Sequence, residues 1–131
     1  MTAQGSFVTF DWTPQEPYDA VDGVTLAVVT LGKTFEGDLK GSSTVTMIVS
    51  SSEHDVSRSY VAMERVTGRI EDREGTFVLQ HNAVSDSGDD SLTCTVVPGS
   101  GTGRLAGLRG ALQIHIAPDG AHSYVFDYEL P

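Results

Sequence analysis

Apolar and polar residues alternate along most of this chain, and short clusters rich in glycine and aspartate separate the alternating runs. A period of two residues is typical of a β-strand with one buried face, and no segment sustains the 3.6-residue period of a helix. The pattern predicts eight β-strands, which span residues 6–13, 24–36, 42–53, 58–71, 75–86, 90–98, 105–117 and 122–130.

The connections between these strands are short, apart from residues 13–23, where Pro14 and Pro17 exclude a central strand and predict a surface loop. Short connections make neighbouring strands antiparallel, so the chain is predicted to form a meander. Eight such strands form either a two-layered sandwich or a closed barrel, and we favour the barrel because closure removes both exposed edges. The predicted fold is therefore all-β, with residues 1–131 forming one eight-stranded antiparallel barrel domain.

The fourth predicted strand shows which of its faces is buried. Arg65 and Arg69 share one face, and burying two arginines without partners is costly, so this face is predicted to lie outside. The opposite face carries Glu64 and must then point into the barrel, because alternate residues of a strand face opposite sides. On the fifth strand the more apolar face, which is predicted to be the inner one, carries His81.

The turn between these two strands decides how Glu64 and His81 lie relative to each other. A two-residue turn at Asp72–Arg73 pairs them directly, and a turn at Arg73–Glu74 places them one diagonal step apart, within about 8 Å. A three-residue turn that closes on Gly75 would put them on opposite faces of the sheet.

The same alternation predicts an inner surface that encloses one small apolar molecule. On the first strand, Val8, Phe10 and Trp12 are predicted to share the inner face. The strand over residues 24–36 is apolar on both faces, so its outer face needs a cover, either the proline-rich loop or a second copy in a homo-oligomer. The residues predicted to line the ligand chamber are Trp12, Tyr60, Phe77, Leu79, Cys94, Tyr124, Phe126 and Tyr128.

Acidic residues outnumber basic ones by 18 to 8, which gives a net charge of −10. This charge repels phosphate backbones and anionic lipids, so neither nucleic acid nor a membrane surface is an expected partner. The chain has no apolar run long enough for a transmembrane helix, and its first residues lack the features of a secretion signal. The single cysteine, Cys94, suits a reducing compartment, and a cytoplasmic location is therefore predicted.

Glu64 and His81 are the strongest candidates for catalytic residues. A carboxyl group among apolar side chains is desolvated, which is expected to raise its pKa until it exchanges a proton with a ligand near neutral pH, with His81 as its partner. The alternatives are a buried pair whose members satisfy each other, or a Glu64 that binds an arginine at the barrel mouth. No metal site is predicted, because no three or four ligand side chains converge.

No cofactor motif is found either. The glycine-rich residues 97–110 lead into another strand, whereas a dinucleotide site requires a helix after its glycine-rich turn. The glycines are better explained by tight bending of the chain at a corner of the barrel.

Segments spread over nearly the whole chain match the pattern of one known family. They span residues 35–42, 60–68, 75–81, 97–110 and 127–130, and the fourth of them carries the motifs Gly-Thr-Gly and Leu-Ala-Gly-Leu-Arg-Gly. The chain thereby resembles the bacterial "domain of unknown function 3224" family. That family is similar to the allene-oxide-cyclase-type barrels, whose relatives include plant dirigent proteins and bacterial spirotetronate-forming cyclases. The resemblance implies an eight-stranded antiparallel barrel, often oligomeric, with ligands in the lumen, and it implies no particular reaction.

These observations lead to one principal hypothesis and two alternatives. The principal hypothesis is a barrel that binds a small apolar metabolite in its lumen and acts on it as a cofactor-free isomerase, cyclase or lyase through Glu64 and His81. The first alternative is a non-catalytic carrier or sensor that uses the same cavity. The second is a structural or oligomeric module whose lumen is filled by its own side chains.

Overall fold

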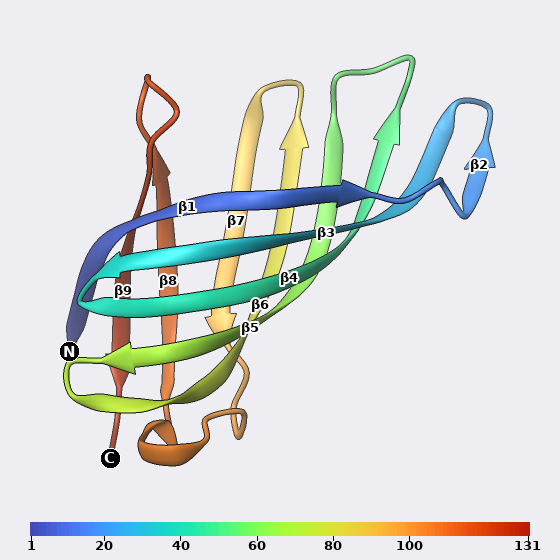
Figure 1. Cartoon of the computed structure of the whole chain (residues 1–131). Helices are drawn as coiled ribbons and strands as arrows, with labels where there is room; N and C mark the ends of the chain where they lie inside the picture. The colour runs from blue at the N-terminus through green and yellow to red at the C-terminus, as the bar shows by residue number, and fades with distance from the viewer.

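The computed structural model describes residues 1–131 and contains nine β-strands and one short helical turn (Figure 1). None of its helical structure is long and apolar enough to cross a membrane. The strands are β1 (Thr2–Pro14), β2 (Asp19–Val21), β3 (Val24–Gly37), β4 (Leu39–Ser52), β5 (Arg58–Ile70), β6 (Arg73–Asp86), β7 (Asp89–Val96), β8 (Arg109–Ile116) and β9 (His122–Glu129), with the 3₁₀ turn η1 (Gly103–Leu105) between β7 and β8.

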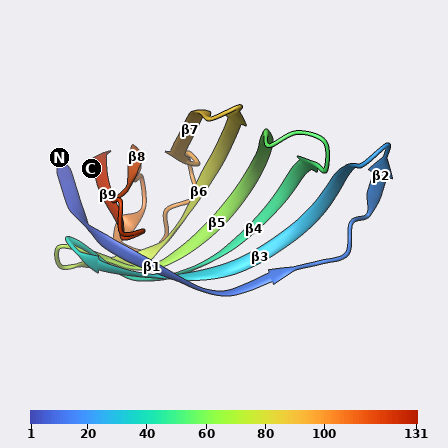
Figure 2. The same cartoon turned by 90° about the horizontal axis from the view of Figure 1, so that it is seen from above.

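All nine strands belong to one antiparallel sheet, and β1 closes this sheet into a barrel. The order of neighbours runs from β1 through β9 down to β3, with β2 at the far edge. The first half of β1 pairs with His122–Asp127 of β9, and most of β1 also pairs with β3, where Gly5 lies opposite Gly37 and Phe10 opposite Gly32. Seen from above, the strands follow a strongly curved wall (Figure 2). The eight-stranded antiparallel barrel predicted from the sequence is confirmed.

Several predicted boundaries differ from the structure; β1, for example, begins at Thr2 and not at residue 6. Residues 13–23, predicted as a loop, contain the short strand β2, in which Asp19 lies opposite Leu26 of β3. The turn between them places Asp22 and Gly23 at positive φ, which suits a tight two-residue hairpin. The seventh predicted strand also begins later, at Arg109, because the glycine-rich segment before it forms η1 and a bend.

The β5–β6 hairpin has its two-residue turn at Glu71–Asp72, a position that the sequence did not suggest. Glu71 adopts a positive φ of 57°, and glutamate seldom takes this conformation. Ile70 therefore pairs with Arg73, which leaves Glu64 and His81 on the same inner face but one diagonal step apart in the ladder.

The inner face of β1 differs from the prediction. Val8 and Phe10 are 63% and 42% exposed and point outward, whereas Phe7 is buried inside. A bulge at Asp11, which has a φ of 56°, then shifts the register of β1 between Phe10 and Thr13. The bulge returns Trp12 to the inner side of the barrel, near its mouth.

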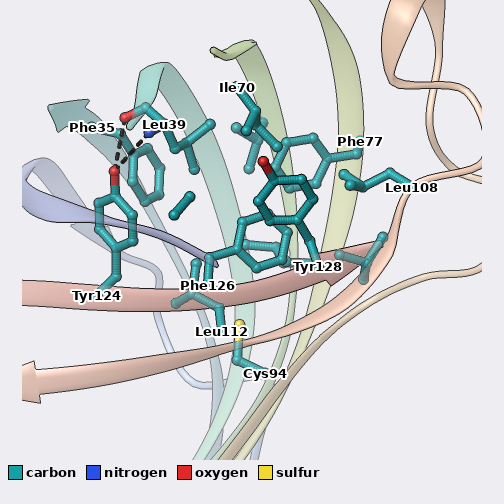
Figure 3. Packing of buried hydrophobic residues seen from close by; sticks show 14 of the residues in the cluster. Phe35, Leu39, Ile70, Phe77, Cys94, Leu108, Leu112, Tyr124, Phe126 and Tyr128 are labelled. Carbon is teal, nitrogen blue, oxygen red and sulfur yellow. Dashed lines mark hydrogen bonds between the residues drawn. The ribbon is translucent and has the colours of Figure 1, made fainter. Parts of the chain in front are cut away.

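One half of the barrel interior is filled by packed side chains. Phe77 stacks on Phe126 with ring centroids 6.0 Å apart, and Phe126 contacts Tyr128 at 5.3 Å. The Tyr124 hydroxyl accepts a hydrogen bond from the Leu39 backbone N–H and donates to nearby carbonyls, as Figure 3 shows for its bonds with Leu39. This packed half comprises Ala3, Phe7, Phe35, Leu39, Val66, Ile70, Phe77, Leu79, Cys94, Val96, Leu105, Leu108, Leu112, Tyr124, Phe126 and Tyr128.

A row of three glycines crosses the sheet beside the packed half. Gly41 of β4 lies opposite Gly68 of β5, which lies opposite Gly75 of β6. A Cβ atom at Gly41 would lie 2.2 Å from the Thr67 carbonyl oxygen, and one at Gly75 would lie 2.0 Å from that of Thr102. Only glycine permits this approach of neighbouring backbones, and the row lets the sheet curl tightly at the filled end.

The barrel wall is weakest between β7 and β8. Only Thr95 and Ala111 pair across this seam, whereas β7 remains fully paired with β6 and β8 with β9. From that point toward the β6–β7 and β8–β9 hairpins the two strands diverge (Figures 1 and 2). The seam therefore exposes the inside of the barrel along its flank.

The outer face of β3 is only partly covered. Leu26 and Val28 are half-buried there. Val28 lies opposite Ile48, which is 44% exposed and itself lies opposite Val61, which is 51% exposed. A second copy of the chain on this face stays a prediction.

Candidate functional site

A buried cluster of charged and polar side chains lies between the packed half and the open end of the barrel. Glu64 is fully buried, and its Oε1 atom accepts hydrogen bonds from Lys33 Nζ at 3.1 Å and from His81 Nε2 at 2.7 Å. Its Oε2 atom accepts from Ser43 Oγ at 2.6 Å. The four residues come from the neighbouring strands β3, β4, β5 and β6, one from each, so the register of the sheet fixes the cluster.

The partners of Glu64 keep it ionised. Burial raises the pKa of the Glu64 carboxyl, but the hydrogen bond from His81, the Lys33 charge, the favourable electrostatics of His81 and the Ser43 hydroxyl together outweigh burial and lower the pKa below its ordinary value. The expectation of a raised pKa was therefore wrong. It considered the apolar neighbours of Glu64 and took no account of Lys33 or Ser43.

The sequence around Lys33 indicates that this side chain points into the barrel. It lies two residues from Leu31 and two from Phe35, and residues two apart on a strand share a face. Both neighbours are buried, so Lys33 points inward as well and is only 7% exposed. Ser43 lies directly opposite Lys33 in the β3–β4 ladder, and a serine on a strand has no distinguishing pattern.

A cavity of about 150 Å³ lies directly above this cluster, toward the open end of the barrel. Lys33 and His81 form part of its lining, whereas Glu64 does not reach it. Most of the other lining residues are apolar: Phe7, Thr9, Trp12, Leu31, Val45, Met47, Tyr60, Leu92, Ile114, Ile116 and His122 complete the wall.

Lys33 presents unused hydrogen-bond donors in this cavity. An ammonium group has three N–H donors, and only the one directed at Glu64 has a protein acceptor. The Lys33 ammonium also lies 4.7 Å from the centre of the Phe7 ring, a distance at which a cation is attracted to the ring face. The charge is thus held in place while its remaining donors are free for a ligand.

A second, larger hollow of about 690 Å³ opens along the seam between β7 and β8. Leu112 and Ile114 of β8 form one wall, and Leu92 of β7 belongs to the other. The residues common to this hollow and the cavity are Tyr60, Leu92, Ile114 and Ile116. The cavity and the seam hollow therefore adjoin.

The structure divides the residues predicted to line the ligand chamber into two groups. Trp12 and Tyr60 line the cavity, and Trp12, which is 58% exposed at the lip, donates its indole N–H to the Thr9 hydroxyl. The buried residues of the packed half face inward as expected but lie outside the cavity: Phe77, Leu79, Cys94, Tyr124, Phe126 and Tyr128. Strand alternation predicts which side a residue faces and not its height along the barrel.

Cys94 and Tyr60 both keep their protons at neutral pH. Burial raises the pKa of the Cys94 thiol to about 12, with a further rise from the Glu64 charge, although the thiol lies 3.6 Å from His81 Nε2. Burial also raises the pKa of the Tyr60 hydroxyl, and Cys94 and Glu64 add to the rise. Cys94 is therefore a poor nucleophile, whereas Tyr60 is a hydrogen-bond donor beside the cavity.

No group of three or more histidine, cysteine, aspartate or glutamate side chains lies close enough together to hold a metal ion. What the site presents to a small molecule is an apolar wall, the Lys33 ammonium, the His81 ring and the Tyr60 hydroxyl. Such a set orients a molecule by one polar group and shelters the rest of it from water.

Comparison with known proteins gives one clear relationship. No curated protein matches the chain. Its fold is similar to the crystal structure of a protein of unknown function from the DUF3224 family of Shewanella oneidensis MR-1, with a TM-score of 0.90 and 37% sequence identity over 100% of this chain and 98% of that one. The likeness to allene oxide cyclases stays a prediction. Residues 3–128 match the model of the family described as "Protein of unknown function (DUF3224)", and the chain belongs to that family.

Proposed function

We propose that this protein binds a small, largely apolar molecule in the open half of its barrel. The observation that carries the proposal is the cavity above the Lys33–Glu64–His81 cluster, which is apolar on its walls and adjoins the hollow at the seam. Binding sites for small molecules commonly combine an apolar lining with a few fixed polar groups. The structural-module alternative requires a lumen filled by the protein's own side chains, and the packed half meets this requirement at one end of the lumen only.

Ala83 offers a direct test of binding. It lies on the inner face of β6, opposite Tyr60 on one side and Leu92 on the other, and these two residues belong to both the cavity and the seam hollow. The neighbouring Asn82 points outward and is exposed. A phenylalanine at position 83 therefore narrows the junction of the two spaces, whereas one at position 82 projects into solvent.

The probe is prodan, a neutral naphthalene ketone whose emission moves to the blue in apolar surroundings. We expect prodan to bind the wild-type protein saturably, with a blue shift and a change in the fluorescence of Trp12, the single tryptophan of the chain. Ala83→Phe is expected to weaken binding by about tenfold or more, equivalent to about 1.4 kcal/mol, while Asn82→Phe leaves it unchanged. Absence of saturable binding, or equal loss in both variants, would contradict the proposal.

A second candidate function, cofactor-free isomerisation, cyclisation or elimination, is favoured by the position of His81. A carboxylate only accepts hydrogen bonds, so the short contact with Glu64 places a proton on His81 Nε2. In the neutral ring this leaves Nδ1 as the nitrogen that accepts a proton, as in other histidine–carboxylate pairs that act as general bases. In this hypothesis His81 touches the substrate, and Glu64 is a positioning residue.

The second candidate predicts proton abstraction from a bound ketone. Wild-type protein in heavy water is expected to accelerate deuterium exchange at the carbon next to the carbonyl of methyl naphthyl ketone, as followed by proton NMR. His81→Gln is expected to abolish this acceleration while prodan still binds. Exchange that is no faster than in buffer would leave the protein as a carrier or sensor.

A further inference from the structure

We propose that the natural ligand is an elongated molecule with an uncharged carbonyl group at one end, which binds with the carbonyl against Lys33 and the apolar tail in the hollow between β7 and β8. This inference rests on the proposed function and specifies the chemical class of the ligand. It follows from three features of the site: the sizes of the two spaces, the distribution of polar groups and the charge balance around Lys33.

The sizes of the two spaces favour a long molecule. A cavity of about 150 Å³ admits roughly one benzene-sized ring. Pockets that bind metabolite-sized ligands measure about 300 to 1,000 Å³. The seam hollow, with about 690 Å³, lies within this range. Since the two spaces adjoin at Tyr60 and Leu92, a ligand larger than a ring extends from one into the other.

The Lys33 charge lies at one end of this path. Lys33 and His81 are at its inner end, in the cavity. The residues shared by the cavity and the hollow, Tyr60, Leu92, Ile114 and Ile116, give the middle of the path mainly apolar surface. Among the 13 residues that line the hollow 7 are hydrophobic, and its polar residues include Arg58, where β5 begins, and Asp90. An amphiphile with its polar head inside and its apolar chain in the seam matches this order.

The charge balance selects an uncharged head. With the His81 ring neutral, as in the second candidate function above, the Glu64 carboxylate neutralises the Lys33 ammonium, and it is the single carboxylate within ion-pair distance of Lys33. A second carboxylate, brought in by a fatty acid, would place an uncompensated negative charge in a poorly hydrated space, which is costly. A ketone, ester or amide carbonyl accepts a hydrogen bond from a spare Lys33 donor and adds no charge.

The test is displacement of prodan by molecules of matched length. Methyl nonyl ketone is expected to displace prodan at concentrations at least about tenfold below those needed for decanoate or undecane. Along the series from methyl propyl to methyl nonyl ketone, each added methylene that is buried should strengthen binding about three- to fourfold. The carbonyl stretching band of the bound ketone should move to lower frequency because Lys33 donates to it.

The outcomes separate the inference from the function on which it rests. Failure of prodan to bind contradicts the proposed function itself. Binding of prodan with decanoate as the better competitor overturns the uncharged head, and affinities that do not change with chain length overturn the tail in the seam. In Ala83→Phe the gain from each added methylene should shrink, while in Asn82→Phe it should persist.

Discussion

Glu64→Gln is expected to lower the free energy of unfolding by about 3 to 5 kcal/mol, because it leaves a buried cation without its counter-charge. Glu64 is the one ion-pair partner of Lys33, and both side chains are almost fully removed from solvent. Glutamine keeps the shape of the side chain, so the loss measures charge and hydrogen bonding and not volume. Urea unfolding at neutral pH, followed by circular dichroism, provides the measurement.

Two further variants make this result interpretable. Glu36→Gln removes the partner of Lys40 in an ion pair that is largely exposed, and it should cost no more than about 1 kcal/mol. Lys33→Met combined with Glu64→Gln should lose less than the sum of the two single changes, because the unpaired buried charge is then gone. A Glu64→Gln variant as stable as Glu36→Gln would show that the cluster holds no buried ion pair.

The stability difference between wild type and Glu64→Gln is also expected to depend on pH. The pKa of Glu64 is lowered in the folded state, so its ionised form stabilises the fold above the ordinary glutamate value of 4.5. This contribution is lost progressively as the pH falls through 4.5 and on through the lower, folded-state pKa. The stability difference between wild type and Glu64→Gln should therefore narrow on acidification.

Phe126→Ala is expected to destabilise the protein by about 3 to 5 kcal/mol and yet leave prodan affinity unchanged. Phe126 is fully buried between Phe77 and Tyr128, so its removal creates a hole that rigid strands on all sides cannot close. The hole lies in the packed half, whereas the proposed binding space lies on the other side of the Glu64 cluster. Chemical unfolding and prodan titration on the same sample measure the two effects.

Val8→Ala is the matched control for this truncation. Val8 is 63% exposed on the outer face of β1, so the loss of its methyl groups should change stability by no more than about 0.5 kcal/mol. If Phe126→Ala weakened prodan binding strongly while the protein remained folded, the packed and open halves would form one continuous binding space. The division of the lumen described above would then be wrong.

The sequence predicted the barrel well where a strand carried a clear contrast between its faces. On β5, Arg65 and Arg69 identify the outer side, and the buried face with Glu64 follows from them. On β1 the contrast misleads, because the outer residues Val8 and Phe10 are more apolar than inner positions such as Thr9. The bulge at Asp11 then reverses the alternation of inner and outer faces for Trp12, and no residue type in the sequence predicts such a bulge.

The candidate site was predictable in part for similar reasons. The proximity of Glu64 and His81 required only that both strands turn the same faces inward, which a two-residue turn at any of several positions provides. The sign of the Glu64 pKa shift depended on Lys33 and Ser43, which reach it from β3 and β4. Their approach is set by the register of the barrel, which a single sequence does not specify.

The closure of the barrel by β1 also has a consequence for how the protein forms. Thr2 donates a hydrogen bond to Asp127 across a separation of 125 residues, so the first strand of this barrel finds one of its two neighbours only after the last strand of the barrel has been synthesised. Pairings this distant along the chain give a high contact order and slow folding. Until β9 arrives, β1 has only β3 as a partner, and the nascent sheet presents an unsatisfied edge that chaperones or neighbouring chains can engage.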